Sequence, residues 1–202
     1  MGHTYSGFTV KNRARFMDTV ETARKAVALA WADIQDVRRR KRPSRLYARW
    51  FGKYSNERVK KVFDVINAIN YAIGGGSITF ERAQGSTDYA AAYRPPGGWG
   101  QQSVKQLIDS GRYKIEVGDP LANVSTNFFV KLHNRSQAGK HGDVQTFIHE
   151  MSHLFGGTDD VEFAGMPLYG WMPSNMLARL NPDNAVKHAD CYGFYCAYQL
   201  DR

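Results

Sequence analysis

Two stretches in the first third of the chain carry apolar residues at helical spacing. The first runs from Thr9 to Arg39, and its apolar positions recur every three or four residues: Phe16, Val20, Ala23, Val27, Trp31, Ile34 and Val37. The second follows Ser55 and ends at the glycines 74–76, with an apolar face made of Val59, Val62, Phe63, Ile66 and Ile69. These spacings predict two amphipathic helices, of which the first cannot easily continue past Pro43 and the second is capped by Ser55.

Between these helices lies an aromatic stretch, which we interpret as a loop anchored by Tyr47, Trp50 and Phe51 before Gly52. After the second helix the pattern changes, and four short segments are typical of strands: 77–82, 88–94, 113–117 and 127–132. A short helix around Ile108 ends at Gly111. We therefore expect a small mixed sheet in the middle of the chain.

Helical patterns return toward the C-terminus. Asp143 is a good N-cap for a helix that runs to Phe155 and stops at two glycines, and Asn181-Pro182 begins a last helical region. The order of helices, a small sheet and further helices indicates the α+β class. We expect one domain over residues 1–202, with a basic helix in 1–44 and the core of the fold in 45–202.

Charge is distributed unevenly along the chain. Lys and Arg total 27 against 19 Asp and Glu, a net charge of +8. Residues 1–61 hold 16 Lys or Arg against 5 Asp or Glu, so the first third is strongly positive and the remainder mildly negative. The extreme case is the basic cluster Arg38–Arg42, which suits a solvated helix C-terminus. Contact with nucleic acid or another acidic surface is the alternative interpretation.

Composition excludes several classes of protein. Hydrophobic residues make up 43% of the chain and charged residues 23%, which is typical of a folded globular domain. No run approaches the roughly 18 apolar residues of a transmembrane segment, and the first residues lack the apolar stretch of a secretory signal. Cys191 and Cys196 are too few for a disulfide framework, so we expect two unpaired thiols.

The helix predicted from Asp143 carries the most informative motif, His149-Glu150-Met151-Ser152-His153. Two histidines four residues apart lie on one helical face, where each can direct a ring nitrogen at the same Zn²⁺ ion. Glu150 can reach a water beside that ion and act as general base. The motif therefore predicts a zinc-dependent hydrolase.

A catalytic zinc site needs a third protein ligand. The turn Gly156-Gly157 can fold the chain back and bring a carboxylate to the ion. Asp159, Asp160 and Glu162 are all within reach, and His188 and Asp190 are more distant alternatives. The residues alone do not choose between the two adjacent aspartates.

The segment Gly157-Thr158-Asp159-Asp160 after the His-Glu-x-x-His motif resembles the aspzincin metallopeptidases, which include deuterolysins and peptidyl-Lys metalloendopeptidases. Their pattern is Gly-Thr-x-Asp-x-x-Tyr-Gly, with the Asp as third zinc ligand. The resemblance therefore implies a zincin-like fold, a zinc endopeptidase acting on proteins or peptides, and metal ligands His149, His153 and Asp160. It is strongest at 149–160 and extends weakly over 45–200.

The family tyrosine does not stand at its usual spacing. Phe163-Ala164 occupies the expected place, and Tyr169-Gly170 comes six residues later. We expect an insertion within 163–168 that leaves Tyr169 to stabilise the oxyanion, with replacement by Phe163 as the alternative.

The C-terminal part departs from the family pattern as well. In lysine-specific members an Asp and a Glu three positions later bind the substrate's basic side chain. Asp190 matches the Asp and is our candidate substrate-binding residue, but Gly193 stands in place of the Glu.

Two functional hypotheses follow. Similar domains form the toxic part of bacterial toxins and injected effectors, so we expect a toxin or effector secreted or delivered into a target cell by a non-classical route. Its producer would need an immunity or inhibitor protein as partner. The alternative is a basic module that binds nucleic acid or an acidic surface, with a structural or vestigial zinc site and aromatic residues 47–54 stacking on bases. The intact Glu150 argues against the alternative, because a structural zinc site does not need it.

Overall fold

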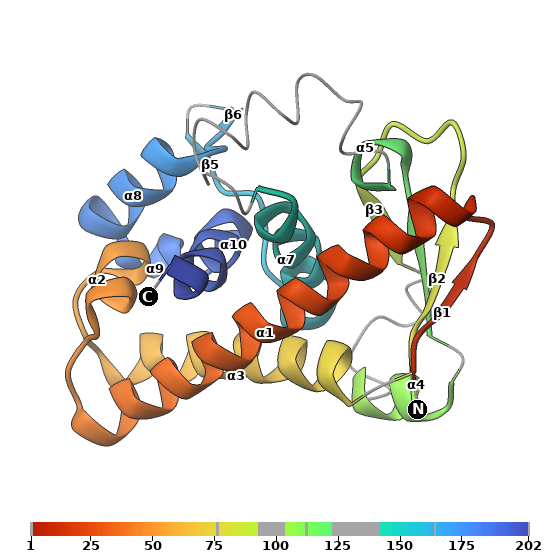
Figure 1. Ribbon diagram of the computed structural model, residues 1–202. Helices are drawn as coiled ribbons and strands as arrows, with labels where there is room; N and C mark the ends of the chain where they lie inside the picture. The colour runs from red at the N-terminus through yellow and green to blue at the C-terminus, as the bar shows by residue number, and fades with distance from the viewer. Residues whose placement is uncertain are drawn as a thin grey trace.

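The fold was derived from a computed structural model, which describes residues 2–75, 77–92, 104–111, 113–122, 142–163 and 165–201. A small sheet stands at one end of the molecule, and a group of short C-terminal helices stands at the other (Figure 1). Helix α7 (Gly142–Gly156) runs between them, and the long helix α1 (Val10–Arg40) crosses the whole assembly. The α+β class is confirmed. The predicted strand at 127–132 lies outside the described residues.

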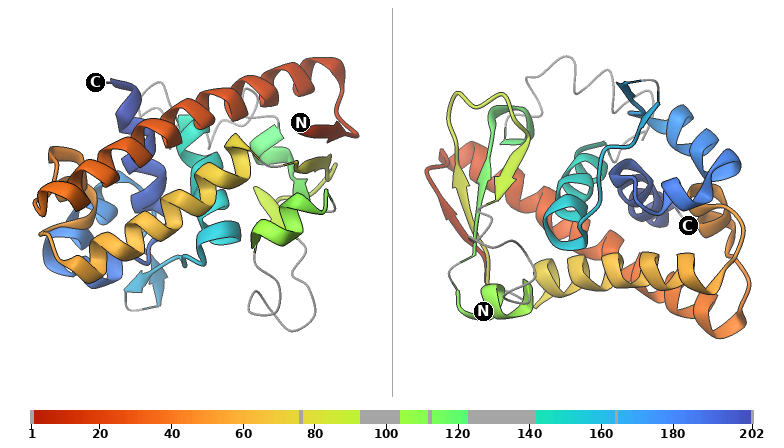
Figure 2. Two further views of the ribbon diagram at one scale, coloured as in Figure 1. Left: turned by 90° about the horizontal axis from the view of Figure 1, so that it is seen from below. Right: turned by 180° about the vertical axis from the view of Figure 1, so that it is seen from behind.

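The two long N-terminal helices form as predicted. Helix α1 begins after Thr9, whose side chain accepts a hydrogen bond from the Asn12 N–H, and ends at Lys41, before Pro43. Helix α3 (Asn56–Gly74) begins after Ser55, whose hydroxyl caps the Arg58 N–H. The two helices pack side by side, as two views of the molecule show (Figure 2). Their apolar faces together build much of the core.

The predicted loop between them is wrong, because residues Arg45–Phe51 form helix α2. Ser44 caps it by accepting a hydrogen bond from the Tyr47 N–H. Trp50 and Phe51 are fully buried, and the Trp50 ring stacks on Phe194 at 4.9 Å between ring centroids. The aromatic side chains therefore pack in the core, and this packing stabilises residues 45–51 as a helix.

The sheet has four strands in the order β1-β2-β4-β3. The strands are β1 (Thr4–Ser6), β2 (Thr79–Arg82), β3 (Ala90–Ala92) and β4 (Lys114–Val117). β1 and β4 pair with β2 in parallel, whereas β3 is an antiparallel edge strand, so the sheet is mixed as expected. Sequence analysis missed β1. Between the strands lie the short helices α4 (Val104–Asp109) and α5 (Asp119–Ala122).

Helix α7 is held on several sides. Phe147 packs edge-on against Phe16 of α1 and lies near Phe80 of β2, so one face of α7 is buried between the helices and the sheet. Its opposite side packs along α10 (Ala189–Ala197). α10 is itself tied to α1, because the Tyr195 hydroxyl donates to the Asp33 carboxylate at 2.8 Å. A rigid frame therefore fixes the helix that carries the two histidines.

The remaining C-terminal elements surround α10. They are the hairpin β5 (Glu162–Phe163) and β6 (Met166–Pro167), the helices α8 (Trp171–Leu180) and α9 (Pro182–Ala185), and a final 3-10 turn, η2 (Tyr198–Asp201). Asn181 caps α9 with proline in its first turn, as predicted. Cys191 and Cys196 are buried and unpaired, which confirms the expected thiols. Within the described residues, no helix combines the length and apolar character needed to cross a bilayer.

Candidate metal centre

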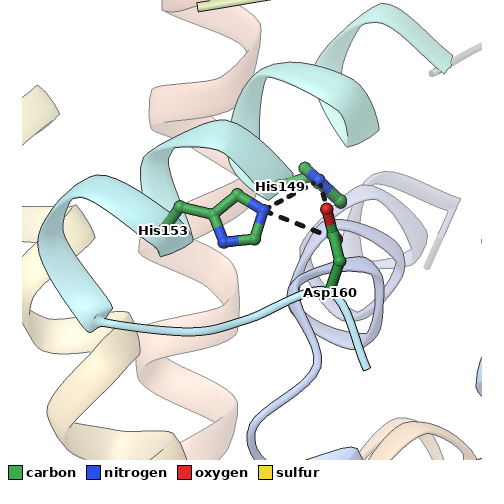
Figure 3. A group of neighbouring side chains, drawn as sticks. All are labelled: His149, His153 and Asp160. Carbon is green, nitrogen blue, oxygen red and sulfur yellow. Dashed lines mark hydrogen bonds and ion pairs between the residues drawn. The ribbon is translucent and has the colours of Figure 1, made fainter. Parts of the chain in front are cut away.

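Helix α7 presents His149 and His153 on one face, one turn apart. Their Nε2 atoms lie 3.1 Å from each other. The Oδ1 atom of Asp160 lies 3.4 Å from the Nε2 of His149 and 3.5 Å from that of His153. Figure 3 shows the three side chains pointing toward one another, two from the helix and one from the segment that follows it.

Hydrogen bonds on the other side of each ring define which nitrogen carries the proton. The Nδ1 of His149 lies 2.8 Å from a carboxylate oxygen of Asp190, and the Nδ1 of His153 lies 2.8 Å from the carbonyl oxygen of Thr158. Both partners are acceptors, so each Nδ1 must donate. In each neutral ring the Nε2 is therefore unprotonated, and its lone pair faces the centre.

The position of Asp160 follows from the backbone of its neighbour. The Asp159 N–H donates to the Lys187 carbonyl at 2.8 Å, and the Asp159 carbonyl accepts from the Ala189 N–H at 3.0 Å. Since successive side chains along an extended segment point to opposite sides, Asp159 faces solvent and Asp160 turns toward the histidines. Gly157, with φ of 59°, makes the turn that returns the chain from α7.

These three groups fit a metal cation. Asp160 Oδ1 is buried, has no hydrogen-bond partner among the described residues, and faces two nitrogen lone pairs. When both rings are neutral, three electron-pair donors face one another and repel unless a cation lies among them, and either a proton on His149 or a metal ion can fill that role. Two imidazoles and one carboxylate are a common ligand set for catalytic Zn²⁺. The three donor atoms all lie within 4.8 Å of one another, which suits a single ion.

Charge at this centre shifts the pKa of its members. Burial alone would lower the pKa of His149, but the carboxylates of Asp190, Glu150 and Asp160 raise it to about 9. Burial also raises the pKa of the Asp160 carboxyl, yet His153 and His149 outweigh it and bring the value to about 2. The carboxylate is therefore ionised over the whole physiological range, as a metal ligand must be.

Glu150 lies next to this group and is largely buried. One of its carboxylate oxygens is 4.0 Å from the Nε2 of His149, and its side chain is 15% exposed. Burial raises the pKa of Glu150, although both histidines oppose the shift. A carboxylate with a raised pKa accepts a proton more readily near neutral pH, which is what a general base requires.

The structure brings Tyr169 to the centre and leaves Phe163 away from it. The Tyr169 hydroxyl donates to the Oδ2 of Asp160 at 2.7 Å, and its ring lies 6.3 Å from that of His149. Burial and the Asp160 carboxylate raise the pKa of the phenol, so it stays protonated and can donate. Phe163 stands on the β5–β6 hairpin and is 71% exposed. The segment of the expected insertion thus forms this hairpin.

The remaining candidates lie around the centre in other roles. His188 is fully buried, and its Nδ1 accepts from the Val161 N–H at 3.2 Å while its Nε2 lies 3.0 Å from the Leu168 carbonyl, so it holds the hairpin segment. Glu162 is exposed on β5. Asp190 is 4% exposed, and both of its oxygens accept hydrogen bonds inside the protein. Sequence analysis expected it to face the substrate.

Sequence analysis missed two groups that support the histidines. Thr158 accepts from His153 through its carbonyl, and its hydroxyl lies 2.7 Å from that of Ser152. Gln145 donates to Asp190 at 2.8 Å. The Gly-Thr pair of the motif was a signal for Thr158, whereas the Gln145 contact spans 45 residues and left no local pattern.

Several basic and aromatic residues on which the nucleic-acid-binding hypothesis depends make contacts within the protein. Arg39 and Arg40 form ion pairs with Asp36 one turn earlier, and Arg38 lies over the Phe63 ring at 3.9 Å. Trp50 is fully buried, so it cannot stack on bases. The basic cluster therefore has the character of a solvated helix end.

Comparison with known proteins agrees with this geometry. Residues 122–197 match the model of the family described as lysine-specific metallo-endopeptidase, Aspzincin_M35. Among solved structures, the chain is similar to a zinc peptidase from Grifola frondosa, with 19% identity and a TM-score of 0.65 over 95% of this chain and 97% of that one. A search of curated proteins gave no match.

The structural similarity covers the whole fold, including the N-terminal helices that the family model does not reach. The family match covers α7, the segment from Asp160 to Tyr169, and α10, and so includes the groups around the centre described above. Zinc is accordingly the cofactor. Residues 122–197 are thus similar to the aspzincin family, and the chain is a zinc metalloendopeptidase.

Proposed function

We propose that the chain hydrolyses internal peptide bonds of proteins with zinc held by His149, His153 and Asp160, and with Glu150 as the general base. The observation that carries this proposal is the convergence of two bare imidazole nitrogens on a buried carboxylate oxygen without a hydrogen-bond partner. The family whose model residues 122–197 match is described as a metallo-endopeptidase, which supports the same class of substrate.

The chemistry is divided between the cofactor and the side chains. Zinc bound at this position lowers the pKa of water and polarises the scissile carbonyl. Glu150 takes the proton of the attacking water and delivers it to the departing amine. The Tyr169 hydroxyl donates its one proton to Asp160 in the structure and would turn that proton to the oxygen of the tetrahedral intermediate during the reaction. Asp160 would thus offer Oδ1 to the metal, while its Oδ2 accepts from the phenol.

Replacement of Tyr169 tests which aromatic residue assists catalysis. We expect Tyr169→Phe to lower kcat by about 10²-fold, the typical cost of losing one oxyanion donor, with zinc content unchanged. Phe163→Ala is the matched control, because Phe163 is the alternative at the family position and lies exposed on the hairpin. A loss of kcat in Phe163→Ala with none in Tyr169→Phe would reverse the assignment.

Zinc affinity should depend on pH in a defined direction. His149 must lose its proton to bind the metal, and its pKa in the metal-free protein is about 9. Protons therefore compete with zinc below that pH, and affinity falls by about tenfold per pH unit for each proton displaced. Competition titrations with a chromophoric chelator from about pH 7 to pH 9 measure the slope. An affinity independent of pH over that interval would contradict the raised pKa of His149.

Metal removal and restoration test the proposed function itself. We expect the wild type to cleave an unfolded protein such as reduced casein, a chelator to abolish cleavage, and zinc to restore it. The same treatment of His153→Ala is the control, since zinc cannot restore a site that has lost a ligand. Cleavage that persists in the chelated wild type would refute the proposal.

We also propose that this peptidase acts as a toxin or effector, secreted or delivered into a target cell by a non-classical route. The support is chemical: the fold holds its two cysteines as buried, unpaired thiols, and the described part of the chain has no disulfide that a reducing cytosol would break. An immunity or inhibitor protein that covers the active site would then protect the producer.

Inducible expression in a host cell tests the effector role. We expect growth arrest on expression of the wild type and normal growth with Glu150→Gln at equal protein level. Normal growth on expression of either the wild type or Glu150→Gln, in bacterial and eukaryotic hosts, would count against a toxic role. It would not contradict the proposed peptidase activity.

A further inference from the structure

Asp190 is buried at the start of α10 and is surrounded by hydrogen-bond donors. Its Oδ1 lies 2.8 Å from the Nδ1 of His149 and accepts from the Gln145 side chain at 2.8 Å. Its Oδ2 accepts from the Gly170 N–H at 2.6 Å. Three donors from two parts of the chain, helix α7 and the segment before α8, therefore use both oxygens, and Asp190 is 4% exposed.

Gln145 reaches this carboxylate from the helix that carries the metal-binding histidines. It precedes His149 by four residues, so the two side chains lie on the same face of α7, one turn apart. Its side chain is buried, and its amide nitrogen can only donate. Gln145 and His149 thus direct two N–H groups at one oxygen, whose two lone pairs accept both.

Gly193 leaves the space that Gln145 fills. A Cβ at position 193 would lie 2.7 Å from the backbone oxygen of Gln145 and 3.0 Å from its amide nitrogen, so α7 and α10 leave no room for a side chain there. The Glu that stands here in lysine-specific members of the family would displace Gln145. In this chain an amide donor accordingly occupies the place of the second acidic group.

We propose that Gln145 is a positioning residue for the metal centre, and that Asp190 serves His149 instead of a substrate's basic side chain. Gln145 fixes the Asp190 carboxylate, the carboxylate fixes the Nδ1–H tautomer of His149, and the Nε2 of that ring is left free for zinc. The inference rests on the proposed function of the site and adds to it a means of orienting one ligand. It also predicts that cleavage is not selective for lysine through Asp190.

Zinc affinity of a volume-conserving variant tests the role of Gln145. Gln145→Met keeps the size of the side chain and removes the N–H donor, and we expect zinc to bind about 10- to 100-fold more weakly. Gln199→Met is the matched control, because Gln199 is also buried (2% exposed) and its amide nitrogen has no hydrogen-bond partner in the structure. The control should bind zinc like the wild type.

Two further readouts separate positioning from a general loss of structure. The visible spectrum of the cobalt-substituted protein should change in Gln145→Met and stay unchanged in Gln199→Met, because it reports ligand geometry. In zinc-saturated enzyme, Gln145→Met should alter kcat more than KM. Wild-type zinc affinity together with an unchanged cobalt spectrum in Gln145→Met would overturn the proposal.

Cleavage sites in a protein digest test whether Asp190 serves His149 or binds a basic side chain of the substrate. We expect the wild type to cut without enrichment of lysine beside the scissile bond, and Asp190→Asn to weaken zinc binding. A strong lysine preference that disappears in Asp190→Asn while zinc affinity is retained would overturn the assignment of Asp190. If the zinc-loaded wild type cuts nothing, the proposed function fails, whereas the zinc and cobalt results still decide the role of Gln145.

Discussion

Glu150→Gln should bind zinc as the wild type does and lose about 10⁴-fold in kcat, the upper end of what a positioned acid–base group contributes. The loss is large because the same carboxylate is expected to act twice, first on the water and then on the departing amine. The amide is isosteric and uncharged, so neither the fold nor the metal ligands need to change. Initial rates on a quenched fluorescent peptide measure the loss of kcat, and zinc content measured on the same sample checks that the metal is retained.

The matched control for this variant is Glu162→Gln, the same substitution at an exposed glutamate on the β5–β6 hairpin. It should retain wild-type kcat and zinc content. Equal losses in the two variants would mean that the effect is not specific to the metal centre. Full activity of zinc-loaded Glu150→Gln would refute the proposed role of Glu150 as general base.

The second large effect concerns the third metal ligand, for which the chain offers two adjacent aspartates. Asp160→Asn should weaken zinc binding by more than the roughly 100-fold that loss of an outer-shell partner costs. Asp159→Asn should bind zinc like the wild type, because its side chain faces solvent and its backbone pairs with that of residues 187–189. The pair is matched in chemistry and differs only in the direction that the backbone gives each side chain.

Chelator competition on purified apoproteins measures this difference without reference to activity. Circular dichroism of each apoprotein verifies that the fold is retained. Strong zinc binding by Asp160→Asn together with weak binding by Asp159→Asn would exchange the two assignments. Equal affinities in both variants would place the third ligand elsewhere.

Local sequence patterns predicted the parts of the fold that local forces determine. Helices α1 and α3 have long apolar faces and side-chain caps at Thr9 and Ser55, so spacing and end signals agree. The two histidines of the centre follow from spacing within one helix turn. The choice of Asp160 over Asp159 came from the family pattern, and the structure supplies its physical reason in the backbone pairing of Asp159.

Elements that depend on distant partners were missed. Helix α8 exposes Met172, Met176 and Leu180 and buries Ser174 and Asn175 beside Leu177 and Ala178. Its apolar residues therefore do not mark a single buried face. Strand β1 has three residues and pairs with β2 some 75 positions later, a contact that no local pattern announces. The same limit hid the support of His149 by Gln145 and Asp190, since α7 and α10 meet only in the folded chain.

The most direct test of zinc-dependent peptide hydrolysis is a cleavage map. An unfolded protein is incubated with zinc-loaded wild type, with metal-free wild type and with zinc-loaded Glu150→Gln, and new termini are identified by mass spectrometry. We predict new internal termini with the zinc-loaded wild type alone. The same set of termini from zinc-loaded Glu150→Gln, or none from a wild type that carries its zinc, would contradict the account.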